Sequence, residues 1–167
     1  MTTDQILARL AACGISPVDP TSFAPEDDDP FFILTDVDDD GVGTLRYVLA
    51  YDAEMIDDKT AYTDWIHEWA RATDRSDAIG DVQSHVDFDG GASFVQWSLN
   101  GTRTRVDFEQ EGDWIHPDAA DAIIDQLGSV EGRTRLFIDN GQGGVYAWVL
   151  PGTVDQFTEL FPEAERA

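Results

Sequence analysis

The dipeptide Asn100-Gly101 constrains the fold of this chain more than any other local feature of its sequence. Asn and Gly both accept positive φ angles, which a two-residue type I′ hairpin turn requires at both of its central positions. The flanking segments 94–99 and 102–108 alternate apolar with polar residues, as paired strands do. We therefore predict an antiparallel hairpin in which Val95, Trp97, Leu99, Thr102, Thr104 and Val106 share one face.

Short connections also join most of the other predicted strands. Parallel neighbours need crossovers of about a dozen residues or more, so the strands are expected to pair mainly antiparallel. The last two strands meet at the glycine-rich turn 139–144. The remaining predicted strands cover residues 31–35, 45–51, 82–88, 135–138 and 145–150.

Helices are predicted where apolar residues recur every three or four positions. Capping-box pairs are expected at Thr2 with Gln5 and at Thr153 with Gln156, and His116 is expected to cap a helix that starts at Pro117. These patterns predict an α+β fold with the order α-β-β-α-β-β-β-α-β-β-α, in which helices cover one side of a curved sheet of about seven strands. The four predicted helices cover residues 3–13, 61–73, 117–127 and the segment after Pro151.

The chain has 167 residues, of which 42% are hydrophobic, enough for a buried core. We therefore expect a single compact domain over residues 1–167. Residues 16–30 are rich in proline and aspartate and are expected to cross this domain as an irregular segment. Cys13 is the sole cysteine, so no intramolecular disulfide can form, and its apolar neighbours predict a buried, unreactive thiol.

Acidic residues dominate the charge. Asp and Glu number 34 against 10 Lys and Arg, which gives a formal net charge of −24. This excludes nonspecific binding to nucleic acids and docking on anionic membranes, both of which need clustered basic residues. A basic protein partner and a salt-rich cytoplasm both remain open as reasons for the acidity. No signal peptide or membrane-spanning segment is predicted, so a cytoplasmic location is expected.

Residues 36–41 match the first half of a calcium-binding loop. Asp36, Asp38 and Asp40 occupy positions 1, 3 and 5, and Gly41 occupies position 6. The match fails at position 12, where Tyr47 replaces the bidentate glutamate. We therefore interpret this segment as a solvated hairpin turn and predict neither a metal nor a cofactor.

No motif in the sequence identifies a catalytic centre. His67, His85 and His116 fall on separate predicted elements, and no serine stands in a Gly-x-Ser-x-Gly elbow. The glycine-rich turn 141–144 lacks a lysine and does not open a helix, as a phosphate-binding loop would. Carboxylates are too abundant to single out a catalytic pair. The sequence therefore favours a protein that is not an enzyme.

The tryptophans fall into two groups. Four of them lie on apolar stripes and are expected in the core: Trp65, Trp69, Trp97 and Trp148. Trp114 instead follows the acidic stretch 109–113. It can pack beneath the helix that starts at Pro117, or it can remain half exposed as an interface anchor surrounded by carboxylates.

In its size, acidity and hairpin–helix layout, the chain resembles the immunity proteins of bacterial polymorphic toxin systems. The resemblance implies a cytoplasmic antitoxin that occludes the active site of a basic toxin domain and is a monomer on its own. The activity of such a toxin stays open. The alternatives are a secretion chaperone or adaptor, which would dimerise around an apolar groove, and a calcium-loop protein or undetected hydrolase.

Partner contacts are expected from turns that project from the fold and carry acidic or amide side chains. Turn tips seldom support the core, so they are free to enter a cleft in a partner. The candidate residues are Asp36, Asp38, Asp39 and Asp40 in one turn, Asp139, Asn140 and Gln142 in a second, and Glu109, Glu111, Asp113 and Trp114 in a third segment.

Overall fold

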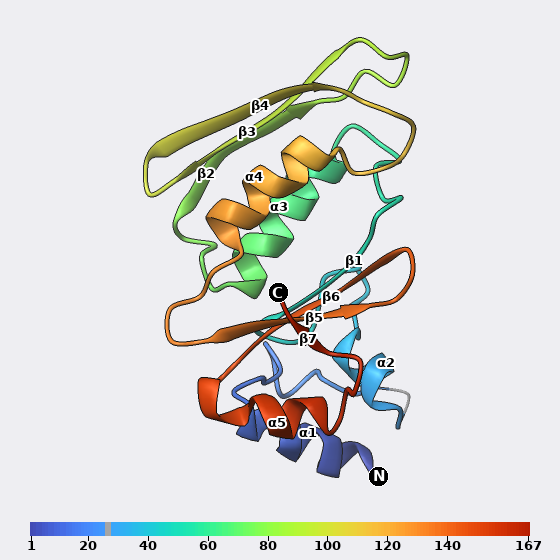
Figure 1. The fold of residues 1–167 in the computed structure, drawn as a ribbon, viewed down its shortest axis with the longest axis vertical. Coiled ribbons are helices and arrows are strands. Elements are labelled where there is room, and N and C mark those ends of the chain that lie inside the picture. Colours follow the sequence, from blue (N-terminus) through green and yellow to red (C-terminus); the bar gives the residue numbers. More distant parts are fainter. Residues whose placement is uncertain (26–27) are drawn as a thin grey trace. The chain divides into compact units, whose positions relative to one another are not determined.

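The computed structural model describes residues 1–25 and 28–167 (Figure 1). This part of the chain contains five α-helices, a short 3₁₀ helix and seven strands in two antiparallel sheets, which confirms the α+β class. The seven strands divide between two sheets instead of forming the single curved sheet that we expected. Within these residues, no helix is long and apolar enough to cross a membrane.

The chain divides into two compact units, and the first unit contains both ends of the chain. The first unit comprises residues 1–50 and 130–167, and the second comprises residues 51–129. Whether the two units unfold together as the single domain predicted for residues 1–167 stays a prediction.

The first unit is built on a four-stranded sheet with the order β1-β6-β5-β7. These strands are β1 (Val48–Asp52), β5 (Thr134–Asp139), β6 (Gly143–Val149) and β7 (Glu165–Arg166). The helices α1 (Thr3–Ala12) and α5 (Val154–Thr158) lie together on one side of this sheet (Figure 1). Their apolar side chains form a continuous core with the strands, which includes Ile6, Leu10, Leu136, Val145, Val149 and Phe157.

The two predicted capping boxes differ in outcome. At α1 the Thr2 hydroxyl accepts from the backbone N–H of Gln5, and the Gln5 side chain accepts from Thr2, as predicted. The prediction at Thr153 is wrong, because its hydroxyl donates to the carbonyl of Leu150. Thr153 closes the 3₁₀ helix η1 (Pro151–Thr153), which runs directly into α5.

The strand predicted at residues 31–35 is wrong, because the chain forms the helix α2 (Pro30–Leu34) there. The Asp29 carboxylate accepts from the backbone N–H of Phe31 and so caps the helix. Pro30 occupies the first turn, where its missing N–H is harmless. A short apolar run suits a buried strand and a buried helix equally, and here the capping residues decide between them.

The irregular segment 16–30 is described in part. Residues 16–25 contain turns and one bridge between Pro17 and Leu45. Glu26 and Asp27, from the acidic run in this segment, lie outside the described residues.

The segments that flank the sheet of the first unit are held by burial of Cys13 and by contacts of Arg133. Cys13 is fully buried at the end of α1, and burial raises the pKa of its thiol, consistent with an unreactive side chain. The Arg133 guanidinium donates to the carbonyls of Gly14 and Trp148, at 3.0 and 2.8 Å, and lies 3.4 Å from the centre of the Tyr47 ring. Tyr47 has a φ of 63°, so β1 begins at Val48, later than the predicted position 45.

The second unit packs two helices, α3 (Ala61–Ala72) and α4 (Pro117–Leu127), on one face of a three-stranded sheet (Figure 1). Its strands are β2 (Ile79–His85), β3 (Ala92–Leu99) and β4 (Thr102–Glu109), in the order β2-β3-β4. All four tryptophans that we predicted to lie in the core are buried. Trp65, Trp69 and Trp97 lie in the second unit, and Trp148 lies in the first.

The β3–β4 hairpin confirms the predicted turn and register. Asn100 and Gly101 have φ angles of 50° and 81°, as a type I′ turn requires. Val95 lies opposite Val106 and Trp97 opposite Thr104, so these side chains share one face as predicted. That face meets α4, where the Gln126 side chain accepts from Trp97 Nε1 and donates to the Thr104 hydroxyl.

The strand predicted at 82–88 starts and ends earlier, at Ile79 and His85. The Asp87 carboxylate accepts from the backbone N–H of Asp89, and Gly90 has a φ of 86°, so residues 86–91 form the turn into β3. Phe88 therefore lies on a turn and is 42% exposed.

Candidate functional site

The Asp36–Gly43 turn is held by hydrogen bonds between its own side chains and its own backbone. A bridge between Val37 and Gly43 closes the turn, and Asp38 Oδ1 accepts from the backbone N–H groups of Asp40 and Val42, at 3.0 and 2.9 Å. Asp36 Oδ2 accepts from the Thr44 hydroxyl at 2.7 Å. Two of the four carboxylates thus stabilise the turn itself, while Asp39 and Asp40 are exposed.

The Asp36–Gly43 turn contains the residues that match the first half of a calcium-binding loop. Throughout residues 1–25 and 28–167, no group of three or more His, Cys, Asp or Glu side chains is arranged so that it could hold a metal ion. The observed turn is formed by hydrogen bonds from its own backbone and from Thr44, and the helix α2 precedes it directly.

The Asp139–Gly144 turn joins β5 to β6 in the first unit. Asp139 Oδ1 accepts from the backbone N–H of Gly141 at 2.7 Å, and Asn140 Oδ1 accepts from that of Gln142 at 3.3 Å. Gly141 has a φ of 93°, which permits the reversal. This hairpin tip is exposed from Asp139 to Gln142, so its amide side chains face solvent.

The loop that follows β4 is held from within by Gln110, which is only 3% exposed. Gln110 Oε1 accepts from the hydroxyl of buried Tyr62 at 2.9 Å. Gln110 Nε2 donates to the carbonyls of Gly112 and Trp114, at 3.0 and 2.7 Å. The Tyr62 oxygen in turn accepts from the backbone N–H of His116 at 2.9 Å. One buried amide and one buried phenol therefore fix the whole loop.

Neighbouring backbone adds to this anchoring. The N–H of Ile56 donates to the carbonyl of Asp113, and the N–H of Ile115 donates to that of Ala53. His116 caps α4 as predicted, and its ring stacks on Phe108 with 4.9 Å between the ring centres. Loop segments held by several buried hydrogen bonds keep one conformation, so the backbone of this loop is fixed by its own contacts.

Burial raises the pKa of Tyr62 to about 12, and the hydrogen bond from the backbone N–H of His116 partly opposes that rise. The phenol is therefore neutral at physiological pH and keeps the proton that it donates to Gln110.

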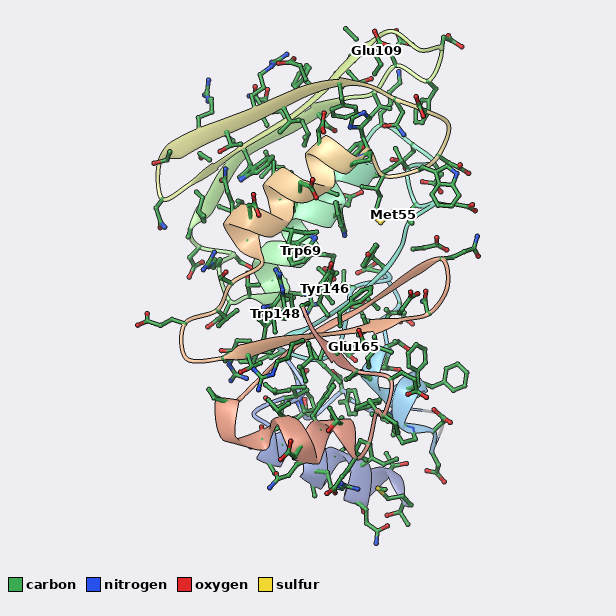
Figure 2. All side chains as sticks on the ribbon, viewed as in Figure 1. Met55, Trp69, Glu109, Tyr146, Trp148 and Glu165 are labelled. Carbon is green, nitrogen blue, oxygen red and sulfur yellow. The ribbon has the colours of Figure 1, made fainter. Side chains whose placement is uncertain are left out.

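The anchored loop presents Trp114 to solvent. Its side chain is 50% exposed, so the half-exposed arrangement is the one observed. Glu109, Glu111 and Asp113 are exposed on the same short stretch, and Figure 2 marks Glu109 at the end of β4. The structure thus combines an aromatic side chain, three nearby carboxylates and a fixed backbone.

Phe88 lies at the same end of the three-stranded sheet and was missed from the sequence. Ala92, the first residue of β3, pairs with Glu109, the last of β4, so the turn before β3 and the loop after β4 leave the sheet together (Figure 1). The sequence Asp87-Phe88-Asp89-Gly90 is typical of a turn and could have identified this residue. We call Phe88, Glu109, Glu111, Asp113 and Trp114 the acidic–aromatic surface.

The histidines lie on different elements, as predicted. His67 is exposed on α3, His85 is exposed on β2 beside Phe94, and His116 caps α4. The predicted partner residues are also divided, since the turns at 36–40 and 139–142 belong to the first unit and the 109–114 loop to the second.

Comparisons with protein-family models, with curated proteins and with solved structures find no match for this chain.

Proposed function

We propose that this chain is a binding domain for a basic protein, and that its acidic–aromatic surface makes the principal contact. The observation that carries the proposal is the half-exposed Trp114 on a loop fixed by buried Gln110 and Tyr62. Tryptophan is enriched at the energetic centres of interfaces, where a ring held on a fixed backbone fills a pocket of the partner.

The fixed loop lowers the cost of binding. A mobile loop loses conformational freedom when a partner orders it, and this loss weakens the complex. The loop at 110–116 is already ordered by its hydrogen bonds to Gln110, Tyr62, Ala53 and Ile56. Burial of the Trp114 ring therefore contributes to affinity without that loss.

Charge determines the class of partner. Glu109, Glu111 and Asp113 are exposed within five positions of the tryptophan in the sequence, in a chain whose net charge is −24. Such a field accelerates association with a basic protein and repels an acidic one. The more specific form of the proposal is an immunity protein that enters the active site of a bacterial toxin domain and blocks it without chemistry of its own.

Affinity capture from the cell of origin at low ionic strength tests the proposal, with Trp114→Ala and Phe32→Ala as matched baits. Phe32 is 60% exposed and lies in the first unit, so it controls for the loss of an exposed aromatic ring. We expect the parent and Phe32→Ala to capture a basic protein. That protein should bind Trp114→Ala more weakly, by about 2 kcal/mol or more in binding free energy. Equal binding to all three baits would contradict the proposal.

The association rate gives a second test with the captured protein. Because steering acts through screened charges, raising the ionic strength should lower the association rate more than it raises the dissociation rate. A rate constant that does not change with salt in stopped-flow measurements would exclude the electrostatic part of the proposal.

A further inference from the structure

The strand β4 forms one edge of the three-stranded sheet and is regular along its whole length. Its pairing with β3 runs without interruption from Leu99 opposite Thr102 to Ala92 opposite Glu109. The other edge, β2, is different, because its register shifts between Gly80 and Gln83 and Asp81 has a φ of 50°. Bulges of this kind protect a sheet edge from further pairing, and β4 lacks this protection in its observed register.

The hairpin turn fixes which backbone groups of β4 face outward. Leu99 and Thr102 flank a two-residue turn, so they exchange both backbone hydrogen bonds, and every second residue of β4 then bonds to β3. The intervening residues direct their N–H and C=O groups toward the open edge. These residues are Arg103, Arg105, Asp107 and Glu109.

The same four residues carry a self-complementary charge pattern, basic in the first half and acidic in the second. If two copies of β4 align antiparallel about an axis at Val106, Arg105 of each copy faces Asp107 of the other. Arg103 then faces Glu109 in the same way. Opposed charges are brought together at the positions whose backbone groups can also pair, so both interactions select one register.

Neighbouring registers are unfavourable. A shift by two residues keeps only one kind of opposite-charge pair, either Arg103 with Asp107 or Arg105 with Glu109. It also places either Arg105 opposite Arg105 or Asp107 opposite Asp107, and like charges directly opposite destabilise a strand pair. A parallel pairing in register places every charge opposite its own kind. The antiparallel register about Val106 therefore has the most opposite-charge pairs and no like-charge pair.

We propose that two copies of this chain pair through their β4 edges and join their sheets into one six-stranded antiparallel sheet. The strand is electrically neutral, although acidic residues outnumber basic ones 34 to 10 in the whole chain. Arg105 and Asp107 already form an ion pair within the strand, at 2.8 Å, and their side chains remain 45% and 69% exposed. Both are therefore accessible to a second copy. The proposed dimer differs from the monomer that we predict from the sequence.

Sedimentation velocity of the purified chain tests the pairing, over a dilution series up to about 1 mM at physiological ionic strength. The parent should shift from monomer to dimer as its concentration rises. Arg105→Asp and Asp107→Arg each place like charges opposite one another, so each alone should raise the dissociation constant about tenfold or more. An equal mixture of the two variants should form a heterodimer, because every opposed pair is then of opposite charge.

Gln83→Asp provides the matched control, since Gln83 is exposed on the opposite edge strand and its replacement also adds a negative charge. It should dimerise as the parent does. Circular dichroism identifies variants that fail to fold. Amide hydrogen exchange of the parent gives an independent readout, because the N–H groups of Arg105 and Asp107 should become protected as the concentration rises.

Three sedimentation results would overturn the proposal. These are a parent that stays monomeric across the series, folded single variants that associate as the parent does, and a mixture of the two variants that stays monomeric. Exchange at Arg105 and Asp107 that is independent of concentration would also overturn it.

Discussion

The turn at residues 36–43 and the loop at 109–114 are both acidic, yet they use their side chains in opposite ways. In the turn, Asp36 and Asp38 accept hydrogen bonds from the turn itself. In the loop, buried Gln110 and Tyr62 hold the backbone from within. The exposed side chains of the loop are therefore not needed to maintain its conformation.

This difference shows why acidity alone does not locate a binding site. A carboxylate that accepts bonds from its own turn must give up that role, or share it, to meet a partner. The carboxylates at Glu109, Glu111 and Asp113 stand beside a half-exposed tryptophan on a backbone anchored by other residues. We therefore propose the loop, and not the turn, as the surface that contacts a partner.

The largest expected effect comes from removing the anchor of the loop. Gln110→Leu leaves the buried Tyr62 hydroxyl without its acceptor and the carbonyls of Gly112 and Trp114 without their donor. Buried polar groups left unpaired in this way should lower the free energy of unfolding by about 2–4 kcal/mol, as measured by urea denaturation. Gln142→Leu, at the exposed hairpin tip, should change it by less than about 0.5 kcal/mol. Equal stability of both variants would show that the loop is not held by Gln110.

Alkaline pH should weaken the same anchor. Folding raises the pKa of Tyr62 from 10.0 to about 12, so the unfolded chain loses this proton first. The contribution of Tyr62 is therefore full below pH 10 and is lost as the pH rises toward about 12, by about 2–3 kcal/mol. Tyr62→Phe should remove this part of the pH dependence, which paired denaturation curves of parent and variant at pH 9 and above would measure. Identical pH dependence of the two proteins would contradict the anchor.

Breaking the acidic turn should have a smaller effect. Asp38→Ala removes the acceptor of two backbone N–H groups, but both lie near solvent, which replaces part of the interaction. We expect a loss of about 1 kcal/mol for Asp38→Ala and almost none for Asp39→Ala, as measured by thermal unfolding. A loss at Asp39 that equals the loss at Asp38 would show that the observed hydrogen bonds do not stabilise the turn.

The smallest expected effect is that of calcium. The turn satisfies Asp36 and Asp38 internally, and Tyr47 stands where a calcium loop closes with glutamate. Millimolar calcium should therefore leave the melting temperature within about 1 °C of its value in magnesium. A rise above about 5 °C that Asp36→Ala abolishes would contradict this interpretation of the turn.

Much of the local structure could be predicted from the sequence because its determinants are neighbours in the chain. The Thr2–Gln5 capping box, the cap at His116 and the Asn100-Gly101 turn each depend on residues a few positions apart. The strand predicted at residues 31–35 is wrong because a run of four apolar residues suits both a strand and the helix α2 that forms there. Asp29, which caps α2 and directly precedes it in the sequence, distinguishes the helix from a strand.

The candidate site could be predicted only in part. The tryptophan and its carboxylates are near one another in the sequence, which singles out Trp114 but leaves open whether it packs beneath α4 or stays half exposed as an anchor. The hydrogen bond between Tyr62 and Gln110 joins residues 48 positions apart, and no sequence pattern pairs them. The division of the strands between two sheets is equally nonlocal, since it depends on which strands pair across the fold.

The most direct test of a binding site at the acidic–aromatic surface compares the two acidic regions at an equal change of charge. The pair Glu111→Gln and Asp113→Asn removes two charges from the loop, and the pair Asp39→Asn and Asp40→Asn removes two from the turn. Isothermal titration of the captured basic partner into each double variant measures the affinity. We predict that the loop variant loses at least about 1 kcal/mol more binding free energy than the turn variant. Equal losses would mean that only net charge matters and would contradict a binding site at the acidic–aromatic surface.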